Sequence, residues 1–270
     1  ANYTGALRLF DDLIALQEGD AAAFSRARGM VAGWLKQYPL RTNKWGPFFE
    51  DIPTGDYSDT EINADTMAAY ILEHPAWDAN WRAHARSILD WTGSTFDNRE
   101  FARFGVTVTN EQTVYRVPGN SHSTRHAATM LLYAEETGDT TQKADAIRRL
   151  NWATYTVDDD GKNRYIRDDV WLTDGYGDYV RHYLRAMGAF PELAPADQNH
   201  LLRTSSVLRS IEYGAGSIRY TKFDAGSEER FKMGAWTPAR VEGGEMQWDP
   251  ASRVLTVKSK MARVAIPKAR

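Results

Sequence analysis

The chain has 270 residues, a formal net charge of −3 and no cysteine, a length that fits one large domain or one domain with a small addition. The charge gives no sign of the broad basic surface that nucleic-acid binding needs, and the missing cysteine excludes disulfides, thiolate zinc sites and cysteine nucleophiles. No apolar run approaches the roughly 20 residues of a transmembrane helix, so no membrane span is expected.

The chain begins with Ala1 rather than Met, as it would after removal of a secretory signal, although trimming would leave the same start. A secreted or periplasmic location is therefore the expectation. Nine Trp and thirteen Tyr favour glycan binding, because flat rings stack on the apolar faces of sugars. Filling of a core by the same rings is the alternative.

The hydrophobic period over the first two hundred residues predicts helices in pairs. The predicted pairs are 6–18 with 21–37, 60–73 with 76–92, 122–137 with 140–157, and 174–188 with 195–211. Ser58 and Glu61 have the spacing of a capping box at the start of the second pair. Pairs that recur about every 50 to 60 residues are too long for a short-repeat solenoid. They predict a mainly α fold, an α/α toroid, complete or incomplete, in which helices alternate between an inner and an outer ring.

From about residue 213 the apolar residues alternate with polar ones, as they do in strands. The alternating segments are 217–223, 253–258 and 263–266. They predict a small antiparallel β region over 213–270, after a helical domain over 1–212.

Three connectors that lead into helices combine aromatic rings with charged or amide groups: 45–51, 110–122 and 168–178. Side chains in connectors are free of core packing and often carry function. The recurrence predicts one rim of a helical scaffold that is lined for a polar ligand with flat faces, and a carbohydrate fits best. The candidate sugar-binding residues in or next to these connectors are Trp45, Glu50, Asp51, Arg167, Trp171 and Asp178.

The helix that starts at His122 has polar residues along one side. At 100° per residue, His122, Arg125, His126, Thr129 and Tyr133 share that side, and no carboxylate lies among them. The pattern predicts donors for an anionic ligand. The alternative is a helix whose histidines bond to neighbouring loops. A metal site is not expected, because two histidines four residues apart need a third ligand.

Several carboxylates lie beside rings or amides rather than in runs of charge. Glu50, Asp51 and Glu111 are therefore candidate general acids. The alternative for the first two is a turn that aromatic residues stabilise. Asp174 has an alternative as a helix N-cap, and Asp178 as part of a surface ion pair.

Two acidic stretches, 158–161 and 168–169, are candidate sites for a structural calcium ion, although such turns are commonly only solvated. No other cofactor is expected.

The run Asn120-Ser121-His122-Ser123 opens a helix, and Asp174-Gly175-Tyr176-Gly177-Asp178-Tyr179 follows about fifty residues later. In these motifs the chain resembles the α/α-toroid polysaccharide lyases of the alginate and chondroitin lyase type. It departs from that family at Thr124, where an aromatic residue is expected, and in showing four hairpins instead of five or six.

The resemblance implies β-elimination on a uronate in an anionic polysaccharide. Asn120 and Arg125 or Arg167 would neutralise the charge on the substrate carboxylate. His122 or a tyrosine, either Tyr176 or Tyr179, would take the proton and return one to the leaving oxygen.

Two alternatives stay open. A glycoside hydrolase of the six-hairpin type needs two carboxylates about 5–5.5 Å apart for retention or about 6.5–9.5 Å for inversion. Its candidates are Glu50 or Asp51, Glu111, and Asp174 or Asp178. A non-catalytic glycan-binding or scaffold module is the other alternative. The oligomeric state is open in every case.

Overall fold

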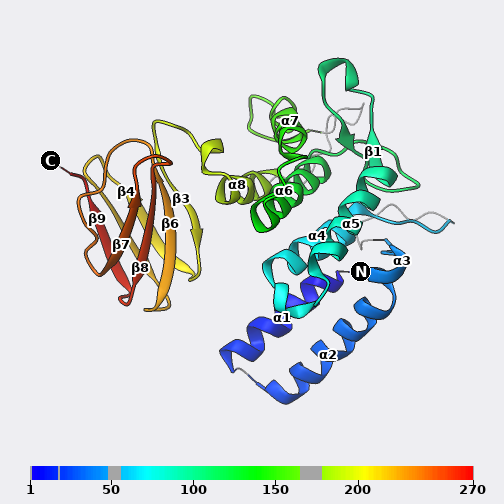
Figure 1. Cartoon of the computed structure of the whole chain (residues 1–270), viewed down its shortest axis with the longest axis horizontal. Helices are drawn as coiled ribbons and strands as arrows, with labels where there is room; N and C mark the ends of the chain where they lie inside the picture. The colour runs from blue at the N-terminus through cyan, green and yellow to red at the C-terminus, as the bar shows by residue number, and fades with distance from the viewer. Residues whose placement is uncertain (1, 18, 48–55, 165–177, 270) are drawn as a thin grey trace. The chain divides into compact units, whose positions relative to one another are not determined.

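The computed structural model describes residues 2–17, 19–47, 56–164 and 178–269. The chain forms two compact units, Ala1–Tyr183 and Leu184–Arg270 (Figure 1). None of the described helices is both long and apolar enough to span a bilayer.

The first unit is built from helices that pack in pairs. The pairs are α1 (Tyr3–Leu16) with α2 (Ala21–Gln37), α4 (Glu61–Glu73) with α5 (Trp81–Phe96), and α6 (Asn120–Thr137) with α7 (Lys143–Thr154). Shorter elements connect them: α3 (Pro39–Thr42), the 3-10 helices η1 (Pro75–Trp77) and η2 (Ala102–Phe104), and the ribbon of β1 (Asp97–Asn98) and β2 (Val108–Thr109). The first three predicted helix pairs are thus confirmed.

Local chemistry sets the ends of these helices. The Asp20 side chain accepts a hydrogen bond from the Ala23 backbone N–H at 2.9 Å and caps α2. Gly138 ends α6 with a φ of +78°, a conformation that costs glycine little. The N-cap of α4 is Thr60, not Ser58, so the predicted capping box is wrong and the Glu61 side chain is left for another role.

Helices α4 and α6 are the most deeply buried elements of the helical unit. Every residue of α6 from Asn120 to Ala134 is buried, and α4 packs directly against it. The apolar side of α4 includes Ala64, Met67 and Ile71, which join a core with residues of α1, α2 and α5. Polar side chains on two such helices must find partners inside the protein, because burial without hydrogen bonds is costly.

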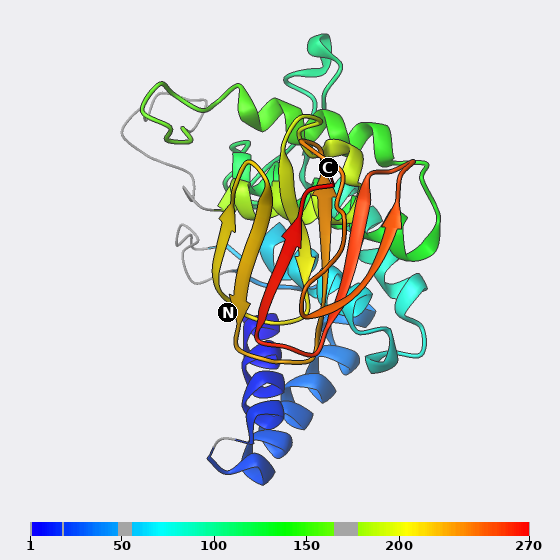
Figure 2. The same ribbon diagram turned by 90° about the vertical axis from the view of Figure 1, so that its left-hand side faces the viewer.

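The second unit contains two antiparallel sheets, ordered β3-β6-β8-β7 and β4-β5-β9 (Figure 2). Their strands are β3 (Asn199–Thr204), β4 (Leu208–Tyr213), β5 (Ser217–Lys222), β6 (Ser227–Met233), β7 (Gly244–Asp249), β8 (Val254–Ser259) and β9 (Arg263–Pro267). Both sheets contribute to one core, in which Ile218, Tyr220, Phe231, Leu255 and Ile266 are at most 2% exposed. In the sequence, α8 (Asp178–Ala189) and the 3-10 helix η3 (Pro191–Leu193) precede these strands.

The prediction of a mainly α toroid with a small β region is wrong. Helices make up 47% of the described residues and strands 23%, and the C-terminal β region is substantial. Residues 195–211, predicted as the second helix of a fourth pair, contain β3 and most of β4 instead. The burial of β3 does not alternate regularly, and its antiparallel pairing with β6 decides for the strand. Residue 213, the expected domain boundary, is the last residue of β4.

Candidate functional site

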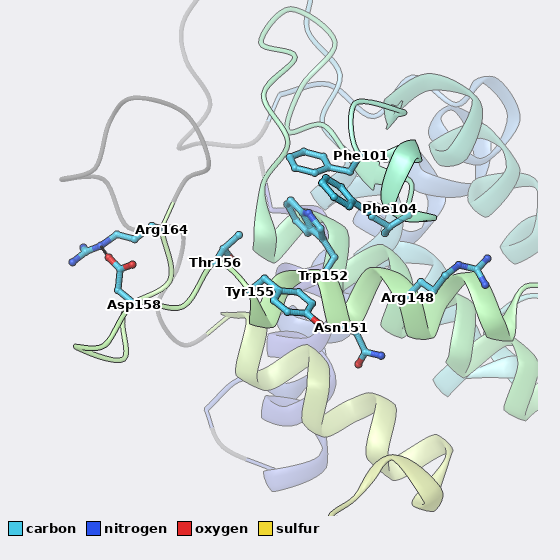
Figure 3. A pocket seen from close by; sticks show the side chains of 10 residues that line it. Phe101, Phe104, Arg148, Asn151, Trp152, Tyr155, Thr156, Asp158 and Arg164 are labelled. Carbon is cyan, nitrogen blue, oxygen red and sulfur yellow. Dashed lines mark hydrogen bonds and ion pairs between the residues drawn. The ribbon is translucent and has the colours of Figure 1, made fainter.

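A hollow of about 790 Å³ opens on the helical unit beside α7 and the turn that follows it (Figure 3). The segment around η2 forms its other side. We call it the aromatic pocket. Its lining residues are Phe101, Phe104, Val106, Arg148, Asn151, Trp152, Tyr155, Thr156, Asp158 and Arg164.

The four rings of the aromatic pocket have different roles. Phe101 and Trp152 meet nearly edge to face, with ring centroids 5.3 Å apart, an arrangement that favours aromatic pairs. Trp152 is only 7% exposed and belongs to a small core with Val106, so these rings form a fixed wall. Phe104 and Tyr155 are 67% and 86% exposed. They offer flat apolar surface to a ligand.

The charged groups of the aromatic pocket are already paired. Arg164 donates from Nε to Asp158 at 2.8 Å and from Nη2 to Asp160 at 2.8 Å. Its hydrogen bond to Asp158 is the main reason that the pKa of Arg164 is raised. Arg148 lies 3.3 Å from Asp145. The two lining arginines therefore bring no uncompensated charge to a ligand.

The amide of Asn151 is a polar group of the pocket that is only weakly engaged, since its Oδ1 accepts from the Tyr183 hydroxyl at 3.4 Å. An amide offers both donors and an acceptor. Such a group beside exposed rings is suited to a ligand with hydroxyl groups.

Asn120 fixes the turn that carries Asp158 and Arg164. Its Nδ2 donates to the Arg164 backbone carbonyl at 3.0 Å and also contacts Thr156 Oγ1 and Asn163 Oδ1. Thr156 in turn donates to Asn163 at 2.9 Å. Asn120 has no exposed surface. It therefore lies behind the wall of the aromatic pocket and holds the turn against the start of α6.

A second polar assembly lies between α4 and α6. We call Glu61, Asp65, His122, Arg125 and His126 the buried ionic cluster, because each is at most 4% exposed. Glu61 Oε1 lies 2.5 Å from His122 Nδ1 and also accepts from Arg125 Nη1. Asp65 Oδ2 lies 3.0 Å from His126 Nδ1.

The two carboxyls of the buried ionic cluster have opposite pKa shifts. Burial alone would raise the pKa of Glu61, but Arg125 and His122 outweigh it and lower that pKa. For Asp65, burial outweighs the attraction of His126 and, with the charge of Glu61, raises the pKa to about 6. Near neutral pH Glu61 is therefore ionised, whereas Asp65 titrates only slightly below that pH.

The cluster changes the interpretation of the polar side of α6. That side was expected to lack carboxylates and to await an anionic ligand. Glu61 and Asp65 of α4 supply the missing negative charge, so His122, Arg125 and His126 contact another helix. The alternative, a helix whose histidines bond to neighbouring loops, is closer to what the structure shows. The histidines do bond to neighbouring structure, but that structure is a helix rather than loops.

The other predicted site residues in the described part of the chain lie away from the lining of the aromatic pocket. Trp45 is 1% exposed and belongs to the main helical core. The Glu111 side chain accepts from Gln112 Nε2 at 3.3 Å. Tyr133 is 9% exposed, with the guanidinium of Arg86 5.3 Å from its ring centroid. Tyr179 packs on the small core of Trp152 behind the pocket.

Six other candidates lie outside the described residues: Glu50, Asp51, Arg167, Trp171, Asp174 and Tyr176. Residues 168–169 of one candidate calcium site also lie outside them. Asp178 is the first residue of α8. In the other candidate calcium site, Asp158 and Asp160 bond to Arg164, and the described residues hold no group of three ligand side chains fit for a metal ion.

The aromatic pocket was not predicted from the sequence, although α7 carries a signal for it. Arg148, Asn151, Trp152 and Tyr155 have the spacing i, i+3, i+4, i+7, which places them on one side of a helix. This side of the helix carries exposed rings and polar groups, and an aromatic segment around Phe101 lies next to it. That combination could have indicated the site.

No family model and no curated protein matches this sequence. Among solved structures, the chain is similar to a selenomethionine derivative of a GH76 alpha-mannanase from Bacteroides thetaiotaomicron, with 12% sequence identity and a TM-score of 0.47. The match covers 71% of this chain and 55% of the mannanase, so the chain spans about half of that protein. At this identity and TM-score the similarity assigns neither a fold family nor an activity. It is a similarity to a glycosidase, and it gives the expected lyase family no support.

Proposed function

We propose that this chain is a carbohydrate-active protein that binds a saccharide in the aromatic pocket. The observation that supports this most is the combination of two exposed rings, Phe104 and Tyr155, with the amide of Asn151 in one hollow of about 790 Å³. Ligand pockets typically combine apolar and aromatic walls with a few polar groups that fix orientation. A sugar presents both kinds of surface, since its C–H faces suit rings and its hydroxyls suit amides.

A neutral saccharide fits the described lining better than a uronate does. Arg148 and Arg164 are paired with aspartates, and Arg164 with two of them. Recognition of a carboxylate would have to break these pairs or leave the new charge uncompensated. His122 and Arg125, the expected contacts of a uronate, instead bond to buried Glu61.

The binding test is calorimetry with neutral manno-, gluco- and xylo-oligosaccharides and with oligouronates. Tyr155→Ala is expected to weaken binding of the preferred neutral oligosaccharide about tenfold, which corresponds to about 1.4 kcal/mol, because it removes the most exposed ring. Phe223→Ala is the matched control, since Phe223 is 60% exposed but belongs to the second unit. Equal affinity in the Tyr155→Ala variant and the wild type would show that the saccharide does not use this pocket.

Glycoside hydrolysis is the reaction that the pocket favours, because Asp158 places a carboxylate in its described lining. Hydrolysis needs a second carboxylate across the scissile bond, at the separations given above. The hydrogen bond from Arg164 holds the Asp158 carboxylate in a fixed position.

Release of reducing ends from the oligosaccharide that binds tests this reaction. Asp158→Asn is expected to lower the rate at least a hundredfold, as loss of a catalytic carboxylate does, with little change in binding. Asp160→Asn is the matched control, because Asp160 contacts the same arginine but does not line the pocket. Unsaturated products in place of simple reducing ends would contradict hydrolysis.

A further inference from the structure

The outer face of the β4-β5-β9 sheet contains a second hollow, of about 410 Å³. Alternate residues of β5 and β9 point into the core of the second unit, where Ile218, Tyr220, Val264 and Ile266 are buried. The residues between them therefore face outwards. The outward residues that line the hollow are Ser210, Glu212, Arg219, Thr221, Arg263 and Ala265.

The hollow exists because a small residue interrupts a row of long ones. Strand register places Glu212 opposite Arg219, and Arg219 opposite Ala265. On the far side of Ala265, Glu242 pairs with it through two backbone hydrogen bonds of 2.8 and 3.1 Å. Ala265 thus forms the floor between longer neighbours. Gly243 extends this floor, because its φ is +93° and a Cβ at this position would lie only 2.8 Å from the Arg263 carbonyl oxygen, which leaves no room for a side chain.

Positive charge dominates the free ionic groups around this floor. Neither Arg219 nor Arg263 has a carboxylate within ion-pair distance in residues 178–269 or elsewhere in the described chain. Thr221 lies opposite Arg263, so the two arginines are diagonal neighbours on adjacent strands. Of the two lining glutamates, Glu242 is engaged by Arg240 at 2.5 Å, which leaves Glu212 as the counter-charge.

Two hydroxyl groups also line the hollow. Ser210 Oγ and Thr221 Oγ1 lie 2.7 Å apart on neighbouring strands. Each hydroxyl can bond its neighbour and still donate to or accept from a ligand. Guanidinium groups recognise planar oxyanions through two parallel hydrogen bonds, a geometry that an ammonium group cannot reproduce.

We propose that this hollow binds an oxyanion group, a carboxylate or a sulfate, between Arg219 and Arg263; that an acidic saccharide carries this group rests on the carbohydrate-active function proposed above. The Ser210–Thr221 hydroxyl pair contacts the same group, and Glu212 at the edge limits the site to one negative charge. This site is independent of the aromatic pocket, which belongs to the other unit and suits a neutral sugar.

The test is calorimetry on the whole chain at physiological salt with three probes: oligogalacturonate, a heparin-derived oligosaccharide and neutral dextran. At least one of the two charged probes, oligogalacturonate or the heparin-derived oligosaccharide, is expected to bind. Dextran is not expected to bind. Arg219→Ala or Arg263→Ala should weaken binding at least tenfold. Arg219→Lys should weaken it nearly as much, because it keeps the charge but loses the paired donors. Glu212→Gln should strengthen it.

Two controls separate this site from general charge attraction and from the aromatic pocket. Lys258→Ala removes an exposed cation of the other sheet, paired at 3.6 Å with Glu228, and should leave affinity unchanged. Tyr155→Ala should also leave the affinity for the charged probe unchanged. This expectation holds even if the proposal of saccharide binding in the aromatic pocket proves wrong. Preference for oligogalacturonate or for the heparin fragment identifies the oxyanion. The proposal would be overturned if neither oligogalacturonate nor the heparin fragment binds. It would also be overturned if Lys258→Ala and Arg219→Ala weaken binding equally.

Discussion

At the scale of single residues, Glu61 and Asp65 explain why α6 can bury two histidines and an arginine. The Glu61 carboxylate has no exposed surface and contacts both His122 and Arg125. Asp65, one turn further along α4, does the same for His126. Charges at this depth persist only when partners compensate the loss of water. The cluster therefore couples two central helices through specific polar contacts as well as through apolar packing.

Glu61→Gln is expected to lower the free energy of unfolding by about 3–5 kcal/mol, because it removes a carboxylate that compensates the buried Arg125 charge. Urea unfolding followed by far-UV circular dichroism measures this. Glu73→Gln is the control, since Glu73 pairs with Arg8 near the surface, where an ion pair contributes at most about 1 kcal/mol. A Glu61→Gln variant as stable as the control would show that the cluster contributes no net stability.

Asp65→Asn is expected to change how stability depends on pH. The pKa of Asp65 is raised from its ordinary 3.8 to about 6 in the folded chain. The stabilising contribution of the protonated carboxyl is therefore fully present below about pH 4 and is lost as pH rises through about 6. Asparagine has nearly the same shape as the protonated acid and does not ionise. The melting temperature of the variant relative to wild type should thus rise between about pH 4 and about pH 7.5, and a constant difference would contradict the shift.

At the scale of elements, the turn after α7 acquires its shape from α6. The sequence from Asp158 to Gly161 reads as an acidic turn, and Arg164 closes it by bonding to Asp158 and Asp160. Asn120, the first residue of α6, then ties this turn to that helix through three contacts. The position of the polar side of the aromatic pocket thus depends on a residue that does not line it.

Asn120→Ala is expected to weaken saccharide binding in the aromatic pocket while leaving the rings in place. Loss of the contact to the Arg164 carbonyl should loosen the turn and cost about 1–3 kcal/mol of stability, because the carbonyl loses its buried donor. Amide hydrogen exchange over residues 156–164 should accelerate, while exchange in α7 stays as in wild type. Unchanged exchange in the turn would show that Asn120 does not hold it.

At the scale of the whole molecule, the chain contains two units with separate cores. One core gathers side chains from α1, α2, α4 and α5, and the other lies between the two sheets. In the second core, buried Lys222 pairs with Glu229 at 3.4 Å, and the Tyr220 hydroxyl donates to the same carboxylate at 2.8 Å. These polar contacts link β5 of one sheet with β6 of the other.

Phe231→Ala is expected to lower the stability of the β unit by about 3–5 kcal/mol, because Phe231 is fully buried in its core. Calorimetry should show this as a shift of one thermal transition, while the transition that Glu61→Gln shifts stays in place. A single transition that both variants shift equally would contradict independent cores.

Sequence periodicity determined the first three helix pairs, since the 3.6-residue pattern of apolar residues and the caps at Asp20 and Gly138 are local properties. Local pattern also identified β5, β8 and β9. It failed at residues 195–211, where a short apolar pattern fits either a helix or a strand and only pairing with β6 decides.

The tertiary structure alone decided what the polar residues do. His122 and Arg125 looked like free donors because their carboxylate partner is Glu61, sixty-one and sixty-four residues away in the chain. The aromatic pocket likewise combines Phe101 with Trp152, which no periodicity connects. Periodicity reports which side of an element is apolar, but the charge and shape that a side chain meets depend on which elements pack together.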